Sequence, residues 1–451
     1  MASFLFTTIP VTAHSTNPLP IAARLVERGH RVRWYAGSAF HERIRAVGAE
    51  PIGYTAADDF SEALITDHFP QLVGSGPTII SRAFADVFIG QAAARVADLR
   101  PVLDAEPADA ALSDGICYGV GLLHELGGPP WASFADGPMP FEEPGVPPFG
   151  PGLAPRGGLS GRARDAVVRA AARRVLFRKP QQAYRRVRAE VGLSDDGRHP
   201  LDVAASPYLH LQGCTPGFEY PRRALPAHSH WVGAFRPDPP DWTPVSWWPE
   251  VVDADRPVVH VSQGSLRPDV TELVVPAIRA LATEPVLVVV TTGGPSEAEV
   301  AAAYGGPLPA NVRVTPFVPY DLLLARAALF VTNGGYSGVT LALHHGVPLV
   351  QAGTTEEKAE IAARIVYTGV GLALGTTRPA ADRVGQAVRR VLHEPSFRAA
   401  AARVSAEMQA HDAASESADL LERLAATRAP VHRDGDGAVT SREAGVSSGA
   451  C

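Results

Sequence analysis

Cysteine is scarce in this chain of 451 residues, which has only Cys117, Cys214 and Cys451. Three widely separated cysteines form neither a disulfide framework nor a CxxC metal site, and they fit a reducing compartment. The sequence also lacks any run of roughly 18 apolar residues, which excludes a membrane-spanning helix. The N-terminal segment has neither the basic start nor the long apolar run of a signal peptide. We therefore expect a cytoplasmic protein without a membrane span.

Basic charge is not in excess either. The net charge is −6 at pH 7, which argues against a general nucleic-acid binder. The nucleotide-binding motifs GxGxxG and GxxxxGK[ST] are absent. No set of His, Cys, Asp and Glu has the spacing of a metal site, so we expect no metal. What remains is an ordinary globular composition, with 46% apolar and 20% charged residues, in a chain long enough for two or three domains.

The first half of the chain alternates short apolar runs with a helical pattern. Residues 3–10 and 31–37 have the composition of buried strands. The helix between them is expected to begin with Asn17 as its N-cap and Pro18 in its first turn, and to end at Gly29. Residues 109–114 and 130–135 continue the strand pattern. This alternation is typical of parallel sheets, so we predict an α/β fold with doubly wound domains.

A second α/β pattern begins near residue 256. Its expected strands are residues 258–265, 286–294, 312–317, 328–335, 348–353 and 370–375, all of them apolar runs typical of buried parallel strands. We predict an N-terminal domain over residues 1–220, a linker over 221–250 and a second domain over 251–400. Residues 401–427 are expected to form helices that pack back towards the first domain, and residues 428–451 to be a disordered tail.

Two unusual segments lie in the first half. Residues 136–158, here called the proline-rich loop, contain seven prolines and six glycines, and long loops of this kind are often functional or mobile. Residues 161–190 carry ten basic residues on an expected pair of helices. This second segment is interpreted either as a solvated basic face or as a patch for an anionic membrane or a partner.

One candidate site follows the first strand. Open α/β sheets bind ligands beyond the carboxyl ends of their strands, and His14 lies there, close to a helix start. The positive end of that helix would disfavour the imidazolium and keep the ring neutral. A neutral imidazole can act as a general base near pH 7, and Asp114, at the same edge, could hold its tautomer. The alternative is a polar surface histidine.

A second candidate site is the segment VTNGGYSG at residues 331–338. A strand, a glycine-rich turn and a helix start form a geometry that binds phosphate through free backbone N–H groups and the helix dipole. Gly264 and Ser265 end another strand of the same half and could reach the same phosphates. The alternative is a tight turn with a purely structural role.

Taken together, these segments resemble family 1 of the glycosyltransferases, in particular the bacterial natural-product, macrolide-type UDP-glycosyltransferases of the GT-B fold. The resemblance rests on IPVTAHSTNP at residues 9–18 with the helix and strand up to residue 37, on residues 314–365, and on their order around a proline-rich linker. It covers most of residues 3–425. It implies two Rossmann-like domains that face each other across a cleft, with the acceptor on the first domain and the nucleotide sugar on the second.

The resemblance also implies roles for single residues. His14 matches the catalytic base, Asp114 the carboxylate that pairs with it, and Phe317 an aromatic residue that stacks on the nucleotide base. The remaining donor contacts that it implies fall on Ser265, Val318, Asn333, Gly334, Gly335, Ser337, Gly338, Glu357 and Lys358. We further hypothesise that the proline-rich loop is an acceptor lid, with Phe134, Met139 and Phe141 as an apolar wall; the alternative is a disordered connector.

Some positions depart from the family pattern. Asn333 stands where a diphosphate-binding His is usual, and Leu341 where a Glu holds the ribose. Glu357 and Lys358 replace an Asp-Gln pair that holds the donor sugar, and Tyr320 replaces a Gln near the base. These changes leave the nucleotide and the sugar open.

The implied activity is the inverting transfer of a hexose from a UDP-sugar or dTDP-sugar to a hydroxyl of a hydrophobic small molecule, as in antibiotic biosynthesis. No cofactor or metal is expected, and the protein is expected to be a monomer or homodimer. Two alternatives are a nucleotide-sugar epimerase of the same fold and a non-catalytic nucleotide-sugar-binding homologue.

Overall fold

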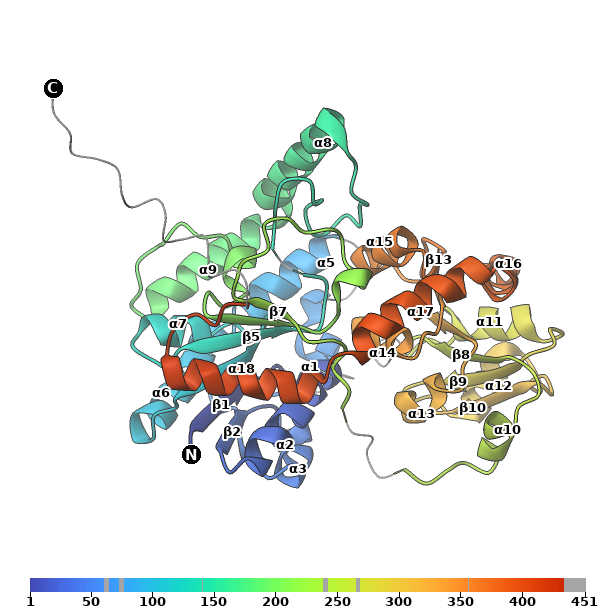
Figure 1. The fold of residues 1–451 in the computed structure, drawn as a ribbon, viewed down its shortest axis with the longest axis horizontal. Coiled ribbons are helices and arrows are strands. Elements are labelled where there is room, and N and C mark those ends of the chain that lie inside the picture. Colours follow the sequence, from blue (N-terminus) through green and yellow to red (C-terminus); the bar gives the residue numbers. More distant parts are fainter. Residues whose placement is uncertain are drawn as a thin grey trace.

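The chain forms two α/β domains, each built on one parallel sheet (Figure 1). The structure is a computed structural model and describes residues 1–60, 65–72, 77–139, 141–237, 242–264, 268–355 and 357–433. The first sheet has the strand order β3-β2-β1-β4-β5-β6-β7 and the second the order β10-β9-β8-β11-β12-β13. In each sheet the strand order reverses beside the strand that comes first in the chain, β1 in the first sheet and β8 in the second. Open α/β sheets bind ligands at such a point.

The strands are short and the helices cover both faces of each sheet. The strands of the first sheet are β1 (Ser3–Thr7), β2 (Arg31–Tyr35), β3 (Glu50–Ile52), β4 (Ala110–Asp114), β5 (Trp131–Ala135), β6 (Leu209–Gln212) and β7 (Ser229–Trp231). Those of the second are β8 (Val258–Ser262), β9 (Leu287–Thr291), β10 (Val312–Thr315), β11 (Leu329–Thr332), β12 (Leu349–Gln351) and β13 (Gly371–Ala373).

The helices of the first half are α1 (Thr12–Thr16), α2 (Leu19–Glu27), α3 (His41–Ala46), α4 (Ile65–His68), α5 (Pro77–Arg82), α6 (Ala92–Ala105), α7 (Val120–Glu125), α8 (Gly158–Ala171) and α9 (Arg178–Glu190). Those of the second half are α10 (Trp248–Val252), α11 (Val274–Leu281), α12 (Glu297–Tyr304), α13 (Tyr320–Leu324), α14 (Tyr336–His344), α15 (Lys358–Thr368), α16 (Ala381–His393), α17 (Pro395–Gln409) and α18 (Ala413–Thr427). None of the helices in the described ranges is both long and apolar enough to cross a bilayer.

All ten predicted strands are present, and the predicted α/β fold is confirmed. The apolar runs of β8 and β9 are buried along their whole length, as expected of central parallel strands. Three strands, β3, β6 and β7, were not predicted. β6 contains His210, whose Nδ1 lies 2.9 Å from the Ser133 hydroxyl, so polar residues alternate with the leucines of this buried strand and it has no continuous apolar run.

The linker begins later than predicted. β7 lies inside the expected linker of residues 221–250 but pairs in parallel with β6 and so completes the first sheet. After the connection, Trp242, Trp247 and Trp248 pack against an apolar cluster of the second domain that includes Val258 and Val289 of its sheet. The described part of the connection therefore starts after Trp231, where the first sheet ends.

The helical entry to the first site also differs from the prediction. Asn17 does not cap α2, because its backbone is helical and it closes the one-turn helix α1. Pro18 precedes α2 instead. The predicted end of α2 is confirmed, since Gly29 takes a left-handed conformation with φ of +82°, which glycine adopts without strain.

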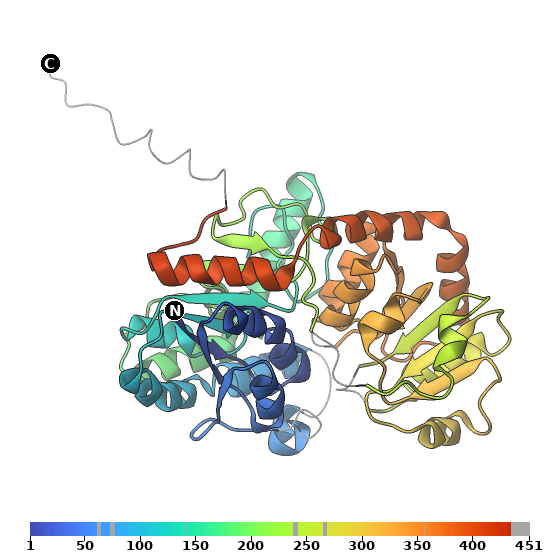
Figure 2. The ribbon, with the colours of Figure 1, turned by 60° about the horizontal axis from the view of Figure 1, so that its bottom comes forward.

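The last helix returns to the first domain (Figure 2). α17 packs on α14 in the second domain, whereas α18 lies on α2 and on strands β4, β5 and β6 of the first sheet. The predicted tail starts too early at residue 428, because Val431 is buried and its N–H donates to the carbonyl of Tyr208. Residues 434–451, the rest of the predicted tail, lie outside the described residues.

We expect Leu421→Ala to destabilise the first domain by about 2–5 kcal/mol, because Leu421 of α18 is fully buried in its core and truncation leaves a cavity. Chemical denaturation followed by tryptophan fluorescence measures the change. Leu159→Ala is the matched control, since Leu159 is 82% exposed, and an equal effect in both variants would contradict this packing.

Candidate active site

His14 and Asp114 meet at the carboxyl edge of the first sheet. His14 lies in α1, directly after β1, and Asp114 ends β4, the strand beside β1. The His14 Nδ1 and Asp114 Oδ2 atoms are 2.8 Å apart, and the Asp114 side chain is only 3% exposed. The predicted pairing of these two residues is therefore present, and the interpretation of His14 as an isolated surface histidine is wrong.

Short polar contacts hold this edge together. The Ser15 hydroxyl donates to the carbonyl of Ile9 over 2.8 Å, which fixes α1 against the end of β1. The Thr7 hydroxyl donates to Ser113 over 2.9 Å, which joins the ends of β1 and β4. The second oxygen of Asp114 accepts the N–H of Ile116 at 3.1 Å. Each partner of the pair is thus held by its own strand end.

The expected neutral state of His14 is wrong. Burial opposes the charge on the ring, but the carboxylates of Asp114, Asp136 and Glu357 outweigh it and raise the pKa of His14 to about 9. A neutral ring was expected from the helix start, but α1 has only five residues, and three carboxylates act on His14. The nearby carboxylates therefore favour the imidazolium form of His14.

The second site lies at the start of α14. Gly334 has φ of +93°, which only glycine adopts without strain, and a Cβ there would meet the Gln351 amide. Gly335 is the N-cap of α14, and a Cβ built on it would find no protein atom closer than 3.9 Å. The predicted glycine-rich turn is confirmed, and open space faces its cap residue.

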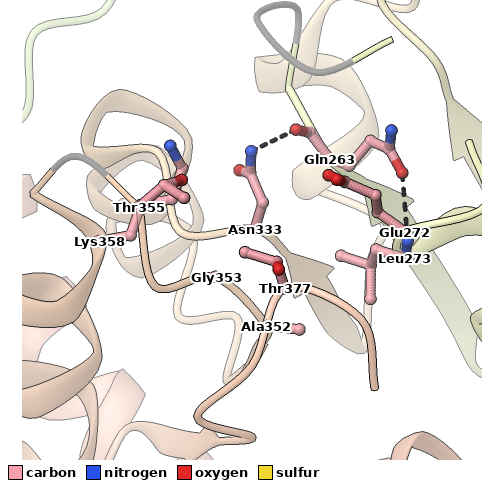
Figure 3. Close-up of a pocket in the computed structure, with 9 residues that line it drawn as sticks. All are labelled: Gln263, Glu272, Leu273, Asn333, Ala352, Gly353, Thr355, Lys358 and Thr377. Atoms are coloured by element: carbon pink, nitrogen blue, oxygen red, sulfur yellow. Dashed lines mark hydrogen bonds between the residues drawn. The ribbon is translucent and has the colours of Figure 1, made fainter. Parts of the chain in front are cut away.

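Asn333 joins two loops of the second domain. Its side-chain amide donates to the carbonyl of Gln263 (Figure 3). Its side-chain oxygen accepts the N–H of Gly335 at 3.3 Å. Asn333 also lines a recess of about 10 Å³ together with Lys358, Gly353 and six other residues. The recess has room for about one water molecule. The side chain that replaces the usual His therefore supports the turn.

The two predicted sites lie next to each other. The hydroxyl of Ser337, in the first turn of α14, donates to Asp136 Oδ2 over 2.6 Å. Asn17, at the end of α1, places its amide nitrogen 3.5 Å from the same hydroxyl. Asp136 and Asn17 belong to the first domain and Ser337 to the second, so this contact joins the two domains.

Asp136 was not singled out from the sequence. It directly follows β5, the strand beside β4, so the rule that ligands bind at strand ends could have found it. Burial raises the pKa of Asp136, partly offset by His14 and by the hydrogen bond from Ser337.

Other donor-side residues have mixed placements. Phe317 is 45% exposed directly after β10, so its ring is available for stacking. Val318 is fully buried in the core, so its side chain cannot contact a ligand, and that prediction is wrong for the side chain. Gly338 lies against the rings of Phe330 and Tyr320. Ser265 is outside the described residues.

The predicted acceptor wall is only partly correct. Phe134 is 1% exposed and packs edge-on against Phe235 inside the core, so it cannot face a ligand. Met139 is also buried, with its N–H donated to Glu219. Phe141 lines a cavity of about 270 Å³ that extends from Asp114 to His228 within the first domain.

The comparisons with known proteins agree with this geometry. The family described as "Erythromycin biosynthesis protein CIII-like, C-terminal domain" matches residues 288–424. The 4'-demethylrebeccamycin synthase of Lentzea aerocolonigenes is 42% identical over 426 residues, which are 94% of this chain and 99% of that protein. UDP-glycosyltransferase 2 of Phaeomoniella chlamydospora is 29% identical over 433 residues, 93% of this chain and 94% of the relative.

Solved structures show the same fold. The glycotransferase of kitacinnamycin superposes with a TM-score of 0.71 at 22% identity, over 94% of this chain and 98% of the other. CalG4, the calicheamicin glycosyltransferase, gives a TM-score of 0.71 at 20% identity, over 95% and 100%. The two facing parallel-sheet domains are those of the GT-B fold. The chain belongs to the natural-product glycosyltransferases of family 1, and it is an enzyme of that class.

We expect Asp114→Asn to lower the pKa of His14 from about 9, because the substitution removes the carboxylate that stabilises the imidazolium. Burial, which lowers the pKa of the ring, is then opposed only by the weaker effects of Asp136 and Glu357. Histidine ring NMR, assigned with a His14→Gln variant, measures the shift, and an unchanged pKa would contradict the pairing.

Proposed function

We propose that this enzyme is an inverting glycosyltransferase that moves a hexose from a nucleotide diphosphate sugar to a hydroxyl group of a hydrophobic natural product. The observation that carries the proposal is the contact between Ser337 and the first-domain residues Asn17 and Asp136. It brings the His14–Asp114 pair next to the glycine-rich turn of the second domain. A base and a phosphate-binding turn at one place are what a single displacement at a sugar carbon needs.

In this mechanism the acceptor oxygen attacks C1 of the donor sugar while its proton passes to Nε2 of His14. Nδ1 remains with Asp114, which stabilises the imidazolium that forms. The bond from C1 to the diphosphate oxygen breaks, and the nucleoside diphosphate leaves. Its growing charge is stabilised by the N–H groups at the start of α14. One displacement inverts the configuration at C1.

The raised pKa of His14 has a consequence for this step. A base must be neutral to accept a proton, and a group with a pKa of about 9 is neutral in only about one hundredth of the molecules at pH 7. The value of kcat/KM should therefore rise with pH towards 9. Asp114→Asn moves this rise to lower pH, and it also loses rate because the amide cannot hold the imidazolium.

The donor is proposed to lie on the second domain. Phe317, 45% exposed, would stack on the base, the turn at Gly335 would bind the diphosphate, and Glu357 and Lys358 at the start of α15 would face the sugar. UDP-sugars and dTDP-sugars both fit this arrangement; one relative is named a UDP-glycosyltransferase, and the solved structure of VinC is a complex with dTDP. No step of the mechanism requires a metal.

The acceptor is proposed to enter the cavity beside Asp114. Its lining combines the rings of Trp131, Tyr118 and Phe141 with polar groups, which suits a largely apolar molecule with a few hydroxyls. The relative named 4'-demethylrebeccamycin synthase is consistent with a natural product as acceptor.

We expect His14→Ala to reduce turnover by about 10²–10⁴-fold, because a positioned general base is lost, and to leave nucleotide binding unchanged. A thermal-shift screen of nucleotide sugars identifies the donor, and mass spectrometry with an acceptor panel measures transfer. Near-normal kcat on a hydroxyl acceptor would contradict the role of His14. Release of nucleoside diphosphate without acceptor would instead indicate an epimerase, and tight binding without any transfer a binding protein.

We expect Gly335→Val to weaken the binding of UDP or dTDP by roughly 10- to 100-fold, since the side chain blocks a hydrogen bond from backbone N–H to diphosphate. The structure leaves room for the side chain itself, so folding should be retained. Gly157→Val is the matched control, because Gly157 is also the extended N-cap of a helix with open space around it. Equal affinities by calorimetry would exclude this phosphate site.

A further inference from the structure

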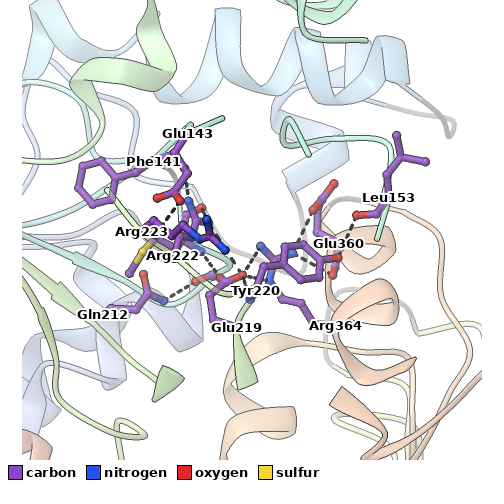
Figure 4. Close-up of polar contacts among 12 residues, drawn as sticks. Phe141, Glu143, Leu153, Gln212, Glu219, Tyr220, Arg222, Arg223, Glu360 and Arg364 are labelled. Atoms are coloured by element: carbon purple, nitrogen blue, oxygen red, sulfur yellow. Dashed lines mark hydrogen bonds and ion pairs between the residues drawn. The ribbon is translucent and has the colours of Figure 1, made fainter. Parts of the chain in front are cut away.

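The proline-rich loop of the first domain is bound to a helix of the second domain through buried charges (Figure 4). One oxygen of Glu360, in the first turn of α15, accepts the N–H groups of Gly150 and Gly152, both at 2.8 Å. The other oxygen accepts from the Arg364 guanidinium at 3.0 Å. These three bonds connect the carboxylate to the loop and to its own helix, and Glu360 is only 2% exposed.

Arg364 extends the network to the strand-end region of the first domain. Its Nε and second terminal nitrogen both lie 2.8 Å from Glu219 Oε1, and its guanidinium carbon lies 4.3 Å from the centre of the Tyr220 ring. Burial opposes the charge, but Glu219 and Glu360 outweigh it and raise the pKa of Arg364. The cation is therefore compensated on both sides, as a buried charge requires.

The network also holds several backbone groups of the loop. Glu219 accepts the N–H of Met139 at 3.2 Å, and the Tyr220 hydroxyl donates to the carbonyl of Leu153 over 3.0 Å. Arg222 donates to the carbonyls of Met139 and Phe141. These bonds fix the path of the loop backbone.

The same helix carries the proposed donor-sugar residues. Glu357 is the N-cap of α15 and Lys358 its first residue, one turn before Glu360. The loop in turn carries Phe141, which lines the cavity that reaches Asp114. The loop and the helix α15 are thus joined directly, through the hydrogen bonds of Glu360, and not only through the domain linker.

We propose that Glu360 and Arg364 are positioning residues that hold the proline-rich loop on α15 and thereby fix the acceptor site relative to the donor sugar. This inference rests on the proposed function, in which the loop borders the acceptor. The described loop residues are anchored at both Met139 and Leu153, which argues against the disordered connector and makes the expected acceptor lid a fixed border of the site.

The first experiment perturbs the connection from the helix side. Glu360→Ala removes the partner of both glycine N–H groups but leaves Arg364 paired with Glu219, so the buried cation stays compensated and the fold should be retained. We expect faster hydrogen–deuterium exchange over residues 141–157, an acceptor KM raised about tenfold, and a dissociation constant for UDP or dTDP within twofold of the original. Glu360→Gln, which keeps one carbonyl oxygen for the loop, should restore part of the protection.

The second experiment perturbs it from the loop side. Gly152 has φ of +63°, and a Cβ there would collide with the carbonyl oxygen of Ala359 in α15. Gly152→Ala should therefore reproduce the effects of Glu360→Ala, and the double variant should add little. Gly145→Ala is the matched control, because Gly145 shares the left-handed backbone with φ of +94° but has open space around it. The matched control for Glu360→Ala is Glu394→Ala, which also removes a carboxylate but breaks only an exposed ion pair with Arg390.

The readouts distinguish a failure of the proposed connection from a failure of the proposed function. Unchanged exchange in both Glu360→Ala and Gly152→Ala would overturn the proposed connection. Faster exchange with an unchanged acceptor KM would show that the connection is only structural, which also overturns the proposal. Absence of transfer by the original enzyme on the whole acceptor panel would count against the proposed function, while the exchange measurement would still test the connection.

Discussion

A carboxylate buried behind an imidazole is the interaction on which this enzyme's arrangement depends. Asp114 is almost completely enclosed, and apart from one backbone N–H its charge is balanced by His14. A buried anion is tolerated only with such a partner. The pair can form because β1 and β4 are neighbours in a parallel sheet, so that residues far apart in sequence end at the same edge. The topology of the sheet therefore determines the chemistry of the site.

The carboxylates around His14 come from both domains. Asp114, Asp136 and Glu357 all act on His14, and Glu357 belongs to the second domain. In the proposed mechanism a diphosphate bound near these carboxylates would need N–H donors, and the turn at Gly335 would supply them. The first domain would then hold the proton that is transferred, and the second domain the leaving group.

The sequence predicts the fold well and the site in part. Continuous apolar runs identify buried strands, and glycine and proline mark their ends, so the ten main strands follow from local pattern alone. β6 does not, since His210 is buried beside the Ser133 hydroxyl of another strand. β7 does not either, since it has only three residues. Phe134 and Val318 fail for the opposite reason: an apolar residue next to a site is as suitable for the core as for a ligand. The charge of His14 depends on carboxylates from three separate strand ends and helices, which no local pattern reveals.

The return of α18 to the first domain gives the molecule two covalent crossings between its lobes. One runs onward from Trp231, and the other lies between Gln409 and Ala413. Two tethers at separate points suppress twisting and sliding and leave a bend about the line that joins them as the easiest relative motion. A bend of this kind has to break the bond between Ser337 and Asp136 and the bonds of Glu360 to Gly150 and Gly152, because all of these join the first domain to the second.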